Sequence, residues 1–255
     1  MTPHLPAAFL RLPLAHRALH DVSKGRPENS RAAIEAAIAA GYGIEIDVQM
    51  SADSQAMVFH DHALDRLTYD AGAVRLRTAE ALGQIPLRGG AEGIPDLPEV
   101  LSLVRGRVPL LIEIKDQDGA MGPNVGPLEA AVAEALARYR GPAAVMSFNP
   151  YSVAKMAKLL PDMPRGLVTS AYEYSEWPLP NAVCDHLRGI PDYDRVGASF
   201  ISHELADLGR DRVTELKAAG ADILCWTVTS PTEEAEARKI AQNITFEQYL
   251  APIPA

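Results

Sequence analysis

The feature that most constrains the fold of this chain is a regular alternation of short β-rich runs with longer helical segments, which continues almost to the end of its 255 residues. The β-rich runs are five to nine residues long. The segments between them repeat apolar residues roughly every three or four positions, as an amphipathic helix does. This alternation predicts a parallel sheet, because two parallel neighbours need a long crossover between them. The predicted strands are residues 11–16, 42–50, 108–115, 143–148, 165–169, 197–202, 222–228 and 243–247.

Helices are predicted between most of these strands. The first spans residues 27–41, with Pro27 in its first turn and Gly41 at its end. Because a closed barrel of eight strand–helix units uses about 250 residues as one domain, the sequence predicts an α/β fold of the (β/α)₈, TIM-barrel type over residues 1–255. The other predicted helices are 98–105, 126–139, 150–160, 207–219 and 231–241.

One segment departs from the alternation. Residues 56–61 have the composition of a strand, yet they follow strand 42–50 after only a few polar residues, too few for a parallel crossover. We therefore expect an antiparallel return strand that carries His60 back over the barrel mouth. Residues 62–97 contain several Gly and Pro and no clear helix, and we expect them to form a small insertion over that mouth.

Charge and hydropathy exclude several classes of function. The formal net charge of −9 and the lack of a Lys- or Arg-rich run argue against nucleic-acid binding. No stretch of about 18 apolar residues is present, and the first residues lack the pattern of a secretory signal. We therefore expect a cytoplasmic protein without stable membrane association that acts on a small molecule. The sequence leaves the oligomeric state open, a homo-oligomer included.

Strand 42–50 carries two acids, Glu45 and Asp47, two positions apart in an otherwise apolar run. Side chains at i and i+2 face the same way about 7 Å apart, where two like charges repel by about 2 kcal/mol. Glu113 repeats the pattern in strand 108–115. Active sites of such barrels lie at the carboxyl ends of the strands, so these three carboxylates predict an all-oxygen site for a hard divalent cation such as Mg²⁺ or Ca²⁺.

Histidine and cationic residues accompany these acids. His16 and Arg17 end the first strand, and His60 ends the return strand. Lys115 lies two positions after Glu113 and faces the same side. Two histidines can serve as general acid and base near neutral pH, and two cationic side chains can clamp a phosphoryl group. The set favours phosphodiester cleavage over acyl or hydride transfer, and no dinucleotide fingerprint is present.

Six short motifs, taken in order, resemble those of the glycerophosphodiester phosphodiesterase family. The resemblance runs from about residue 14 to residue 228 and implies a TIM-type barrel with a small insertion. It also implies hydrolysis of glycerophosphodiesters to an alcohol and glycerol 3-phosphate. The motifs are "HRALHDVSKGRPENS", "IEIDVQMSADSQAMVFHD", "LDRLT", "IPDLPEVL", "IEIK" and "WTV".

The resemblance implies a role for each matching residue. His16 and His60 match the catalytic pair, Arg17 and Lys115 match the phosphate contacts, and Trp226 matches an aromatic wall on the glycerol side. One divalent cation is implied, with Mn²⁺ as a further candidate beside Mg²⁺ and Ca²⁺. Its ligands match Glu45, Asp47 and Glu113, while Glu28, counted with the substrate-binding residues, and Asn29 match a motif near the site.

These roles lead to a mechanistic hypothesis. His60 removes the proton from the glycerol 2-hydroxyl as that oxygen attacks phosphorus, and His16 protonates the leaving alcohol. Water then opens the cyclic phosphate with the two roles reversed. Two alternatives stay open: a lipid phosphodiesterase of the lysophospholipase D or sphingomyelinase D kind on the same barrel, and a non-catalytic barrel that binds phosphorylated metabolites.

The sequence departs from the family pattern in three places. Ala18 replaces the usual Gly after His-Arg, which leaves the backbone beside the phosphate undefined. The segment "SADSQAM" lacks the common Asp-Gly of the hairpin turn, and the tail "NITFEQYL" replaces the usual Thr-Asp-x-Pro ending. We therefore transfer no role to the tail, and we expect His20 to be a structural or surface residue.

Overall fold

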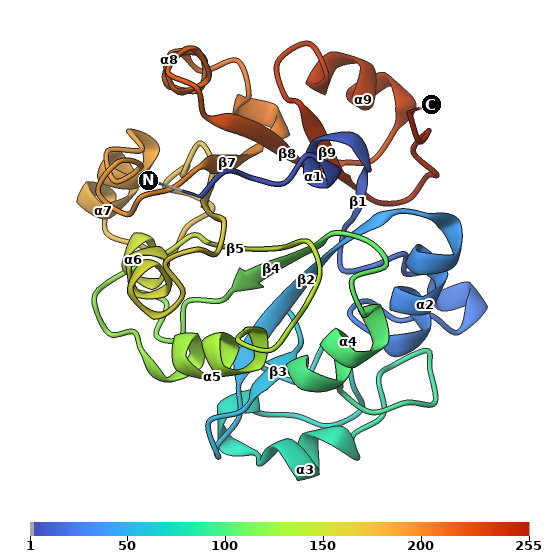
Figure 1. Cartoon of the computed structure of the whole chain (residues 1–255). Coiled ribbons are helices and arrows are strands. Elements are labelled where there is room, and N and C mark those ends of the chain that lie inside the picture. The colour runs from blue at the N-terminus through green and yellow to red at the C-terminus, as the bar shows by residue number, and fades with distance from the viewer. Residues whose placement is uncertain (1–2, 255) are drawn as a thin grey trace.

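The computed structural model describes residues 3–254 and contains a closed barrel of parallel strands surrounded by helices (Figure 1). Every pair of neighbouring barrel strands is parallel, and the first strand pairs with both the last and the second, which closes the ring. The predicted TIM-type (β/α)₈ barrel is thus confirmed. Its strands are β1 (Leu14–Ala15), β2 (Gly43–Met50), β4 (Leu110–Ile114), β5 (Ala143–Ser147), β6 (Arg165–Thr169), β7 (Phe200–Glu204), β8 (Asp222–Val228) and β9 (Asn243–Phe246).

Several predicted boundaries differ from those of the structure, including strand 11–16 (β1, Leu14–Ala15) and helix 207–219 (α8, Asp211–Ala218), and two differ for clear local reasons. The first long helix starts at Arg31 rather than at Pro27, because the Ser30 side chain accepts a hydrogen bond from the Ala33 N–H and caps the helix there. Strand β7 starts later than predicted, because Gly197 has a φ of +60° that interrupts extended backbone. The helices around the barrel are α2 (Arg31–Ala40), α4 (Leu97–Val104), α5 (Pro127–Leu136), α6 (Pro150–Leu159), α7 (Asn181–Arg188), α8 (Asp211–Ala218) and α9 (Pro231–Ala237).

The return strand is confirmed as β3 (Ala56–Val58), which pairs antiparallel with β2. The segment after it is more structured than expected. It contains a 3₁₀ turn at Val74–Leu76 and a short helix, α3 (Ala79–Gly83). It also has its own apolar cluster, so it folds as a small cap beside the barrel. The buried members of that cluster are Met57, Phe59, Leu64, Val74, Leu82, Ile85, Leu87 and Ile94.

The alternation of side chains along the strands decides which residues can form a site. In β2, Ile44, Ile46 and Val48 pack in the layer between the sheet and the helices. Glu45 and Asp47, at the intervening positions, therefore point into the barrel. Below them the interior is filled by apolar side chains, including Phe9 of the short helix α1 (Ala8–Arg11), which closes that end. This interior set is Leu5, Phe9, Leu14, Leu111, Ala144, Met146, Val168, Phe200 and Leu224.

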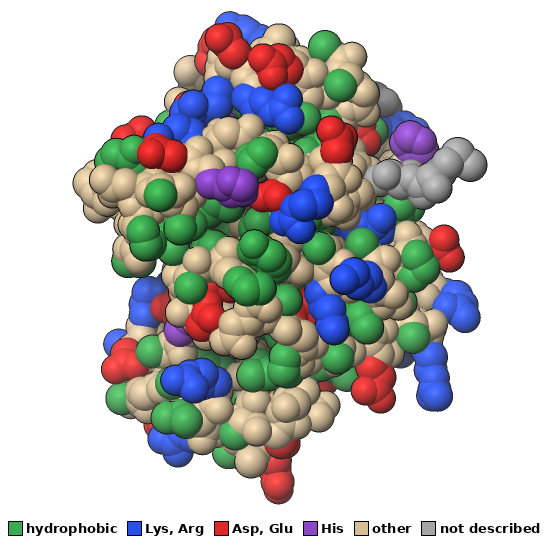
Figure 2. Space-filling model, turned by 90° about the vertical axis from the view of Figure 1, so that its left-hand side faces the viewer, with side chains coloured by type: hydrophobic (Ala, Val, Ile, Leu, Met, Phe, Trp, Pro, Cys, Tyr) green, Lys and Arg blue, Asp and Glu red, His purple; other side chains and the backbone are tan. Residues whose placement is uncertain are grey.

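The surface carries no large patch of one character on the face that Figure 2 presents, where acidic, basic and apolar side chains are interspersed. Within residues 3–254, none of the helices has both the length and the apolar character needed to cross a bilayer.

Candidate active site

Three carboxylates meet inside the barrel near the carboxyl ends of β2 and β4. Glu45 and Asp47 of β2 are each 1% exposed, and Glu113 of β4 is 7% exposed. The strand register places Asp47 directly beside Glu113. One oxygen of each of the three side chains lies within 4.8 Å of the others. The three acids therefore converge on one point, as predicted.

Lys115 offsets part of this negative charge. Its Nζ lies 2.7 Å from Asp47 Oδ1 and 2.7 Å from Glu113 Oε1, so one ammonium bridges two carboxylates. Burial alone would lower the pKa of Lys115, but the two neighbouring carboxylates outweigh burial and raise it above its ordinary value. Likewise, burial would raise the pKa of Asp47, yet Lys115, His60 and Arg17 together hold it well below the ordinary range. Both groups are therefore charged at neutral pH.

Glu45 is the least compensated member of the trio. Its carboxylate accepts a hydrogen bond from the Arg17 backbone N–H at 2.9 Å. Burial, followed by the charges of Asp47 and Glu113, raises the pKa of Glu45 well above its ordinary value. A divalent cation among the three oxygens would offset the repulsion between these carboxylates. Carboxylate oxygens are the donors that hard cations prefer. The donor set thus fits one such ion, held by Glu45, Asp47 and Glu113.

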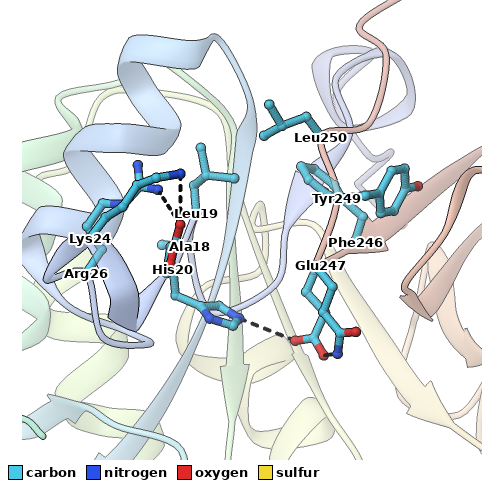
Figure 3. A pocket seen from close by; sticks show the side chains of 11 residues that line it. Ala18, Leu19, His20, Lys24, Arg26, Phe246, Glu247, Tyr249 and Leu250 are labelled. Atoms are coloured by element: carbon cyan, nitrogen blue, oxygen red, sulfur yellow. Dashed lines mark hydrogen bonds and ion pairs between the residues drawn. The ribbon is translucent and has the colours of Figure 1, made fainter. Parts of the chain in front are cut away.

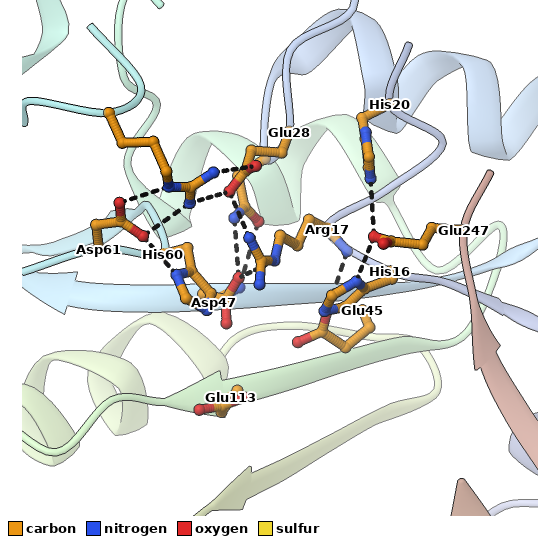
Figure 4. Close-up of polar contacts among 12 residues, drawn as sticks. His16, Arg17, His20, Glu28, Glu45, Asp47, His60, Asp61, Glu113 and Glu247 are labelled. Carbon is orange, nitrogen blue, oxygen red and sulfur yellow. Dashed lines mark hydrogen bonds and ion pairs between the residues drawn. The ribbon is translucent and has the colours of Figure 1, made fainter. Parts of the chain in front are cut away.

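His16 follows β1 and is held by a residue from the far end of the chain (Figure 4). Its Nδ1 lies 2.7 Å from Glu247 Oε2, and His20 Nε2 lies 3.3 Å from the same oxygen. Burial lowers the pKa of His16 below its ordinary value, against the opposing effect of Glu247. The hydrogen bonds from His16 and His20 in turn hold the pKa of Glu247 well below its ordinary range. The contact therefore joins a neutral imidazole to an ionised carboxylate.

His60 follows β3 and is also held at Nδ1 by a carboxylate. The ring nitrogen lies 2.6 Å from Asp61 Oδ1. The guanidinium of Arg66 donates to both oxygens of Asp61 and to both oxygens of Glu28. Burial would raise the pKa of Asp61, but Arg66 and His60 outweigh it and lower it. The cap segment thus braces the second histidine through an arginine.

Arg17 joins the two parts of the site. Its NH1 donates to Glu28 Oε1 at 2.8 Å, and its Nε lies 3.8 Å from Asp47 Oδ2. This Nε is buried and has no hydrogen-bond partner within residues 3–254. Asn29 donates from Nδ2 to Asp47 Oδ2 at 3.0 Å, which fixes that carboxylate from the other side.

A cavity of about 100 Å³ lies over the acids. Phe148 and Trp226 form its aromatic wall, with ring centroids 5.5 Å apart in an edge-to-face arrangement. The indole N–H of Trp226 donates to the Ser202 carbonyl, which orients that ring. The cavity is lined by His16, Arg17, Glu45, His60, Glu113, Lys115, Met146, Phe148, Val168, Trp226, Thr227 and Thr245.

Most of the residues singled out in the sequence line this cavity, and two of them, Asp47 and Glu28, do not. Glu28 lies outside the cavity lining, because both of its oxygens are held by Arg17 and Arg66. Three residues near the histidines were not assigned a role from the sequence: Asp61 and Glu247, which contact them, and His20, which contacts Glu247. Glu247 directly follows a barrel strand, the position at which active-site residues of such barrels concentrate. That rule is the only signal that points to it.

Comparison with known proteins places this chain among phosphodiesterases. The model of the glycerophosphoryl diester phosphodiesterase family matches residues 16–245. The YhdW protein of Bacillus subtilis is 28% identical over 246 residues, which cover 92% of this chain and 93% of that protein. A glycerophosphodiester phosphodiesterase of Caldanaerobacter subterraneus is 32% identical over 176 residues, or 65% of this chain and 70% of the relative.

Solved structures show the same fold. A phosphodiesterase of Oleispira antarctica, in complex with the product sn-glycerol-3-phosphate, superposes with a TM-score of 0.76 at 24% identity, covering 93% of this chain and 94% of that one. A glycerophosphodiester phosphodiesterase of Thermotoga maritima superposes with a TM-score of 0.70 at 21% identity, covering 91% and 92% of the two chains.

Proposed function

This chain belongs to the glycerophosphoryl diester phosphodiesterase family, and we propose that it hydrolyses glycerophosphodiesters to an alcohol and glycerol 3-phosphate with a divalent cation and two histidines. As a member it is a phosphoric diester hydrolase. The product that the Oleispira phosphodiesterase holds supports the same chemistry for this barrel. The metal and the histidine roles are proposed from the site itself.

One observation carries the proposal. Two imidazoles, each with Nδ1 against a carboxylate, line the same small cavity as two of the three clustered acids. A carboxylate at Nδ1 accepts the ring hydrogen and leaves Nε2 as the nitrogen that can exchange a proton with a ligand. The proposed reaction takes one proton from the attacking hydroxyl and gives one to the leaving oxygen. It therefore requires two such nitrogens at one cavity.

In the proposed reaction the 2-hydroxyl oxygen of the glycerol moiety attacks phosphorus, and the bond from phosphorus to the alcohol oxygen breaks. His60 takes the proton of the hydroxyl, and His16 gives a proton to the leaving oxygen. Water then attacks phosphorus of the cyclic phosphate, and the bond from phosphorus to the 2-oxygen breaks. His16 takes the proton of the water, and His60 returns a proton to the 2-oxygen. Both histidines end in their starting states, so the cycle balances.

The acid role requires His16 to be protonated when the first step begins. Burial lowers the pKa of His16 in the substrate-free protein. The negative charge of a bound phosphodiester favours the imidazolium, so we expect His16 to gain a proton as the substrate binds.

The remaining residues position the phosphate. Arg17 Nε is buried without a partner beside the cavity and can donate to a phosphate oxygen. The ammonium of Lys115 adds a second positive charge at the cavity wall. When bound by Glu45, Asp47 and Glu113, a divalent cation would supply charge stabilisation at phosphorus.

The size of the cavity favours a small substrate over a lipid. Its volume of about 100 Å³ is well below the roughly 300–1,000 Å³ of sites that enclose drug-sized ligands. We therefore place glycerophosphodiesters with small alcohols ahead of lysolipids.

The decisive experiment incubates the protein with glycerophosphocholine and assays glycerol 3-phosphate. We expect release with Mg²⁺, Mn²⁺ or Ca²⁺, loss of release with EDTA, and faster turnover of glycerophosphocholine than of lysophosphatidylcholine. Faster turnover of the lysolipid would favour the lipid alternative. Binding of glycerophosphocholine without release under any of the three cations would favour the non-catalytic barrel.

A further inference from the structure

The geometry points to Glu247 as the positioning residue for His16, with His20 contacting the same carboxylate oxygen of Glu247. This inference rests on the proposed function, because it assigns Glu247 a part in that reaction. It also makes a structural claim that can be tested without turnover, since Glu247 determines which ring nitrogen of His16 carries the hydrogen.

The backbone places the two residues together. The His16 N–H donates to the Phe246 carbonyl at 2.9 Å, and Ala15 is paired with Phe246 in the β1–β9 register. The Glu247 N–H in turn donates to the Val228 carbonyl at 3.0 Å. His16 and Glu247 therefore follow adjacent parallel strands at the same level, and their contact is set by the closure of the barrel.

Glu247 lies outside the catalytic cavity. It is absent from the lining of the cavity that His16 faces, and it lines a separate pocket of about 440 Å³ (Figure 3). That pocket also contains His20, Lys24 and Arg26. Because Glu247 contacts His16 but does not line the proposed substrate cavity, we infer that it acts on the reaction through His16.

The chemistry of the contact selects one tautomer. An ionised carboxylate only accepts hydrogen bonds, so the hydrogen of neutral His16 lies on Nδ1, 2.7 Å from Glu247 Oε2. Nε2 is then the nitrogen left for proton exchange. A carboxylate in this position also favours the imidazolium when His16 gains a proton.

His20 and Gln248 complete the surroundings of Glu247. His20 Nε2 lies 3.3 Å from Oε2, and Gln248 donates from Nε2 to Oε1 at 3.2 Å. The Glu247 side chain is 21% exposed, so these contacts limit its alternative rotamers. We expect loss of the His20 side chain to lower kcat less than loss of the Glu247 side chain. His20 contacts Glu247 rather than His16, and its contact is the longer of the two.

The first test measures the tautomer by ¹⁵N NMR of histidine-labelled, metal-free protein, with the His16 signals identified by their loss in His16→Asn. We expect the wild-type ring to carry its hydrogen on Nδ1, and Glu247→Ala to move His16 toward the Nε2–H form. A wild-type ring protonated on Nε2, or an unchanged tautomer in Glu247→Ala, would overturn the inference. If the variant does not fold, the tautomer measured in the wild type alone tests the inference.

The second test is a double-mutant cycle with glycerophosphocholine. We expect Glu247→Ala to lower kcat about 10- to 100-fold with little change in KM, and His20→Ala to lower it about 2- to 5-fold. In a His16→Asn background, Glu247→Ala should cost less than about twofold. The exposed Glu236→Gln serves as the carboxylate control. An equal loss in both backgrounds would refute action through His16, whereas no turnover by the wild type would refute the proposed function and leave the tautomer test standing.

Discussion

His16 and His60 line one cavity but are supported by different parts of the molecule. His16 follows β1, and its carboxylate partner Glu247, 231 positions away in the sequence, follows β9, which lies beside β1 only because the barrel closes. His60 follows β3, outside the barrel, and its partner Asp61 is the next residue along the chain. The first support is built by the barrel and the second by a local dipeptide.

The two supports also differ in what holds the carboxylate. On the barrel side, the Glu247 N–H donates to the Val228 carbonyl at the end of β8, and the Glu247 carboxylate contacts a second histidine, His20. On the cap side, Asp61 is held by Arg66, whose side chain is 47% exposed. An exposed ion pair contributes about 0–1 kcal/mol, whereas backbone pairing in a closed barrel is not lost without opening the sheet. We therefore expect the cap side to tolerate change better than the barrel side.

The largest effects should come from the histidines themselves. His16→Asn and His60→Asn each remove one proton-transfer group, and we expect kcat for glycerophosphocholine to fall about 10²- to 10⁴-fold in either variant. The measurement is glycerol 3-phosphate release, with thermal unfolding as the control for folding. Near-wild-type activity in either variant would remove that histidine from the mechanism.

A change of leaving group separates the two histidines. With a glycerophosphate ester of p-nitrophenol, departure needs no protonation. In single-turnover release of p-nitrophenol, which reports the first step alone, His16→Asn should therefore recover most of its loss, whereas His60→Asn should not. Recovery of His60→Asn instead would exchange the acid and base roles.

The barrel and the three acids could be predicted because both follow from local rules. Strand–helix alternation is readable segment by segment, and the i, i+2 rule places Glu45 with Asp47 on one face. The return strand brought His60 to the same mouth for a similar reason: the link is too short for any other connection. Helix α7 has no counterpart among the predicted helices, although its apolar residues Val183, Cys184 and Leu187 follow the period of a helix.

The support of His16 could not be predicted in the same way. The pairing of β1 with β9 depends on how many strands close the ring, and no local pattern in "NITFEQYL" encodes it. His20 belongs to the loop that departs from the family pattern, so the resemblance offered no position to transfer. Contacts of this kind depend on tertiary closure rather than on the periodicity of any one segment.

The next prediction concerns uncompensated charge in the metal-free protein. Lys115 forms ion pairs with Asp47 and Glu113, which leaves Glu45 as the carboxyl with a raised pKa. A carboxyl whose pKa is raised on folding binds its proton more tightly in the folded state, so stability falls as pH rises from about 4.3, the unfolded value, toward the raised value. Glu45→Gln keeps an acceptor for the Arg17 N–H and removes the charge.

We therefore expect Glu45→Gln to raise the free energy of unfolding of the metal-free protein by about 1–3 kcal/mol at pH 8, and by much less at pH 4.5. Thermal unfolding across this pH range in EDTA provides the measurement. Mg²⁺ should raise the Tm of the wild type and leave that of the variant nearly unchanged. A metal-free variant less stable than the wild type at pH 8 would show that Glu45 is already compensated.

A further prediction concerns Arg66, which holds Asp61 on the cap side of the site. Arg66→Met removes the bridge between Asp61 and Glu28 but leaves the Glu28–Arg17 pair in place. We expect kcat to fall about 3- to 10-fold with little loss of stability, because Asp61 keeps its hydrogen bond to His60. Arg212→Met, which removes a comparable arginine from the exposed pair with Glu215 on α8, is the matched control. Equal activity of the two variants would show that the brace is dispensable.

The smallest expected effect concerns Ala18, in the loop between His16 and His20. Ala18 is buried and has a φ of +66°, a left-handed conformation that costs an L-residue roughly 1–2 kcal/mol relative to glycine. Ala18→Gly relieves this cost but loses a buried methyl group worth about 0.8 kcal/mol and adds about 0.5–1 kcal/mol of chain entropy. The terms nearly cancel, so the free energy of unfolding should change by less than about 1 kcal/mol.

The control is Ala15→Gly in β1. Ala15 is equally buried but is not among the residues with positive φ, so its replacement relieves no strain and should lower the free energy of unfolding by about 1–2 kcal/mol. Equal losses in the two variants, measured by urea unfolding, would mean that the loop beside His16 stores no strain and that the barrel side is held by its strand pairing alone.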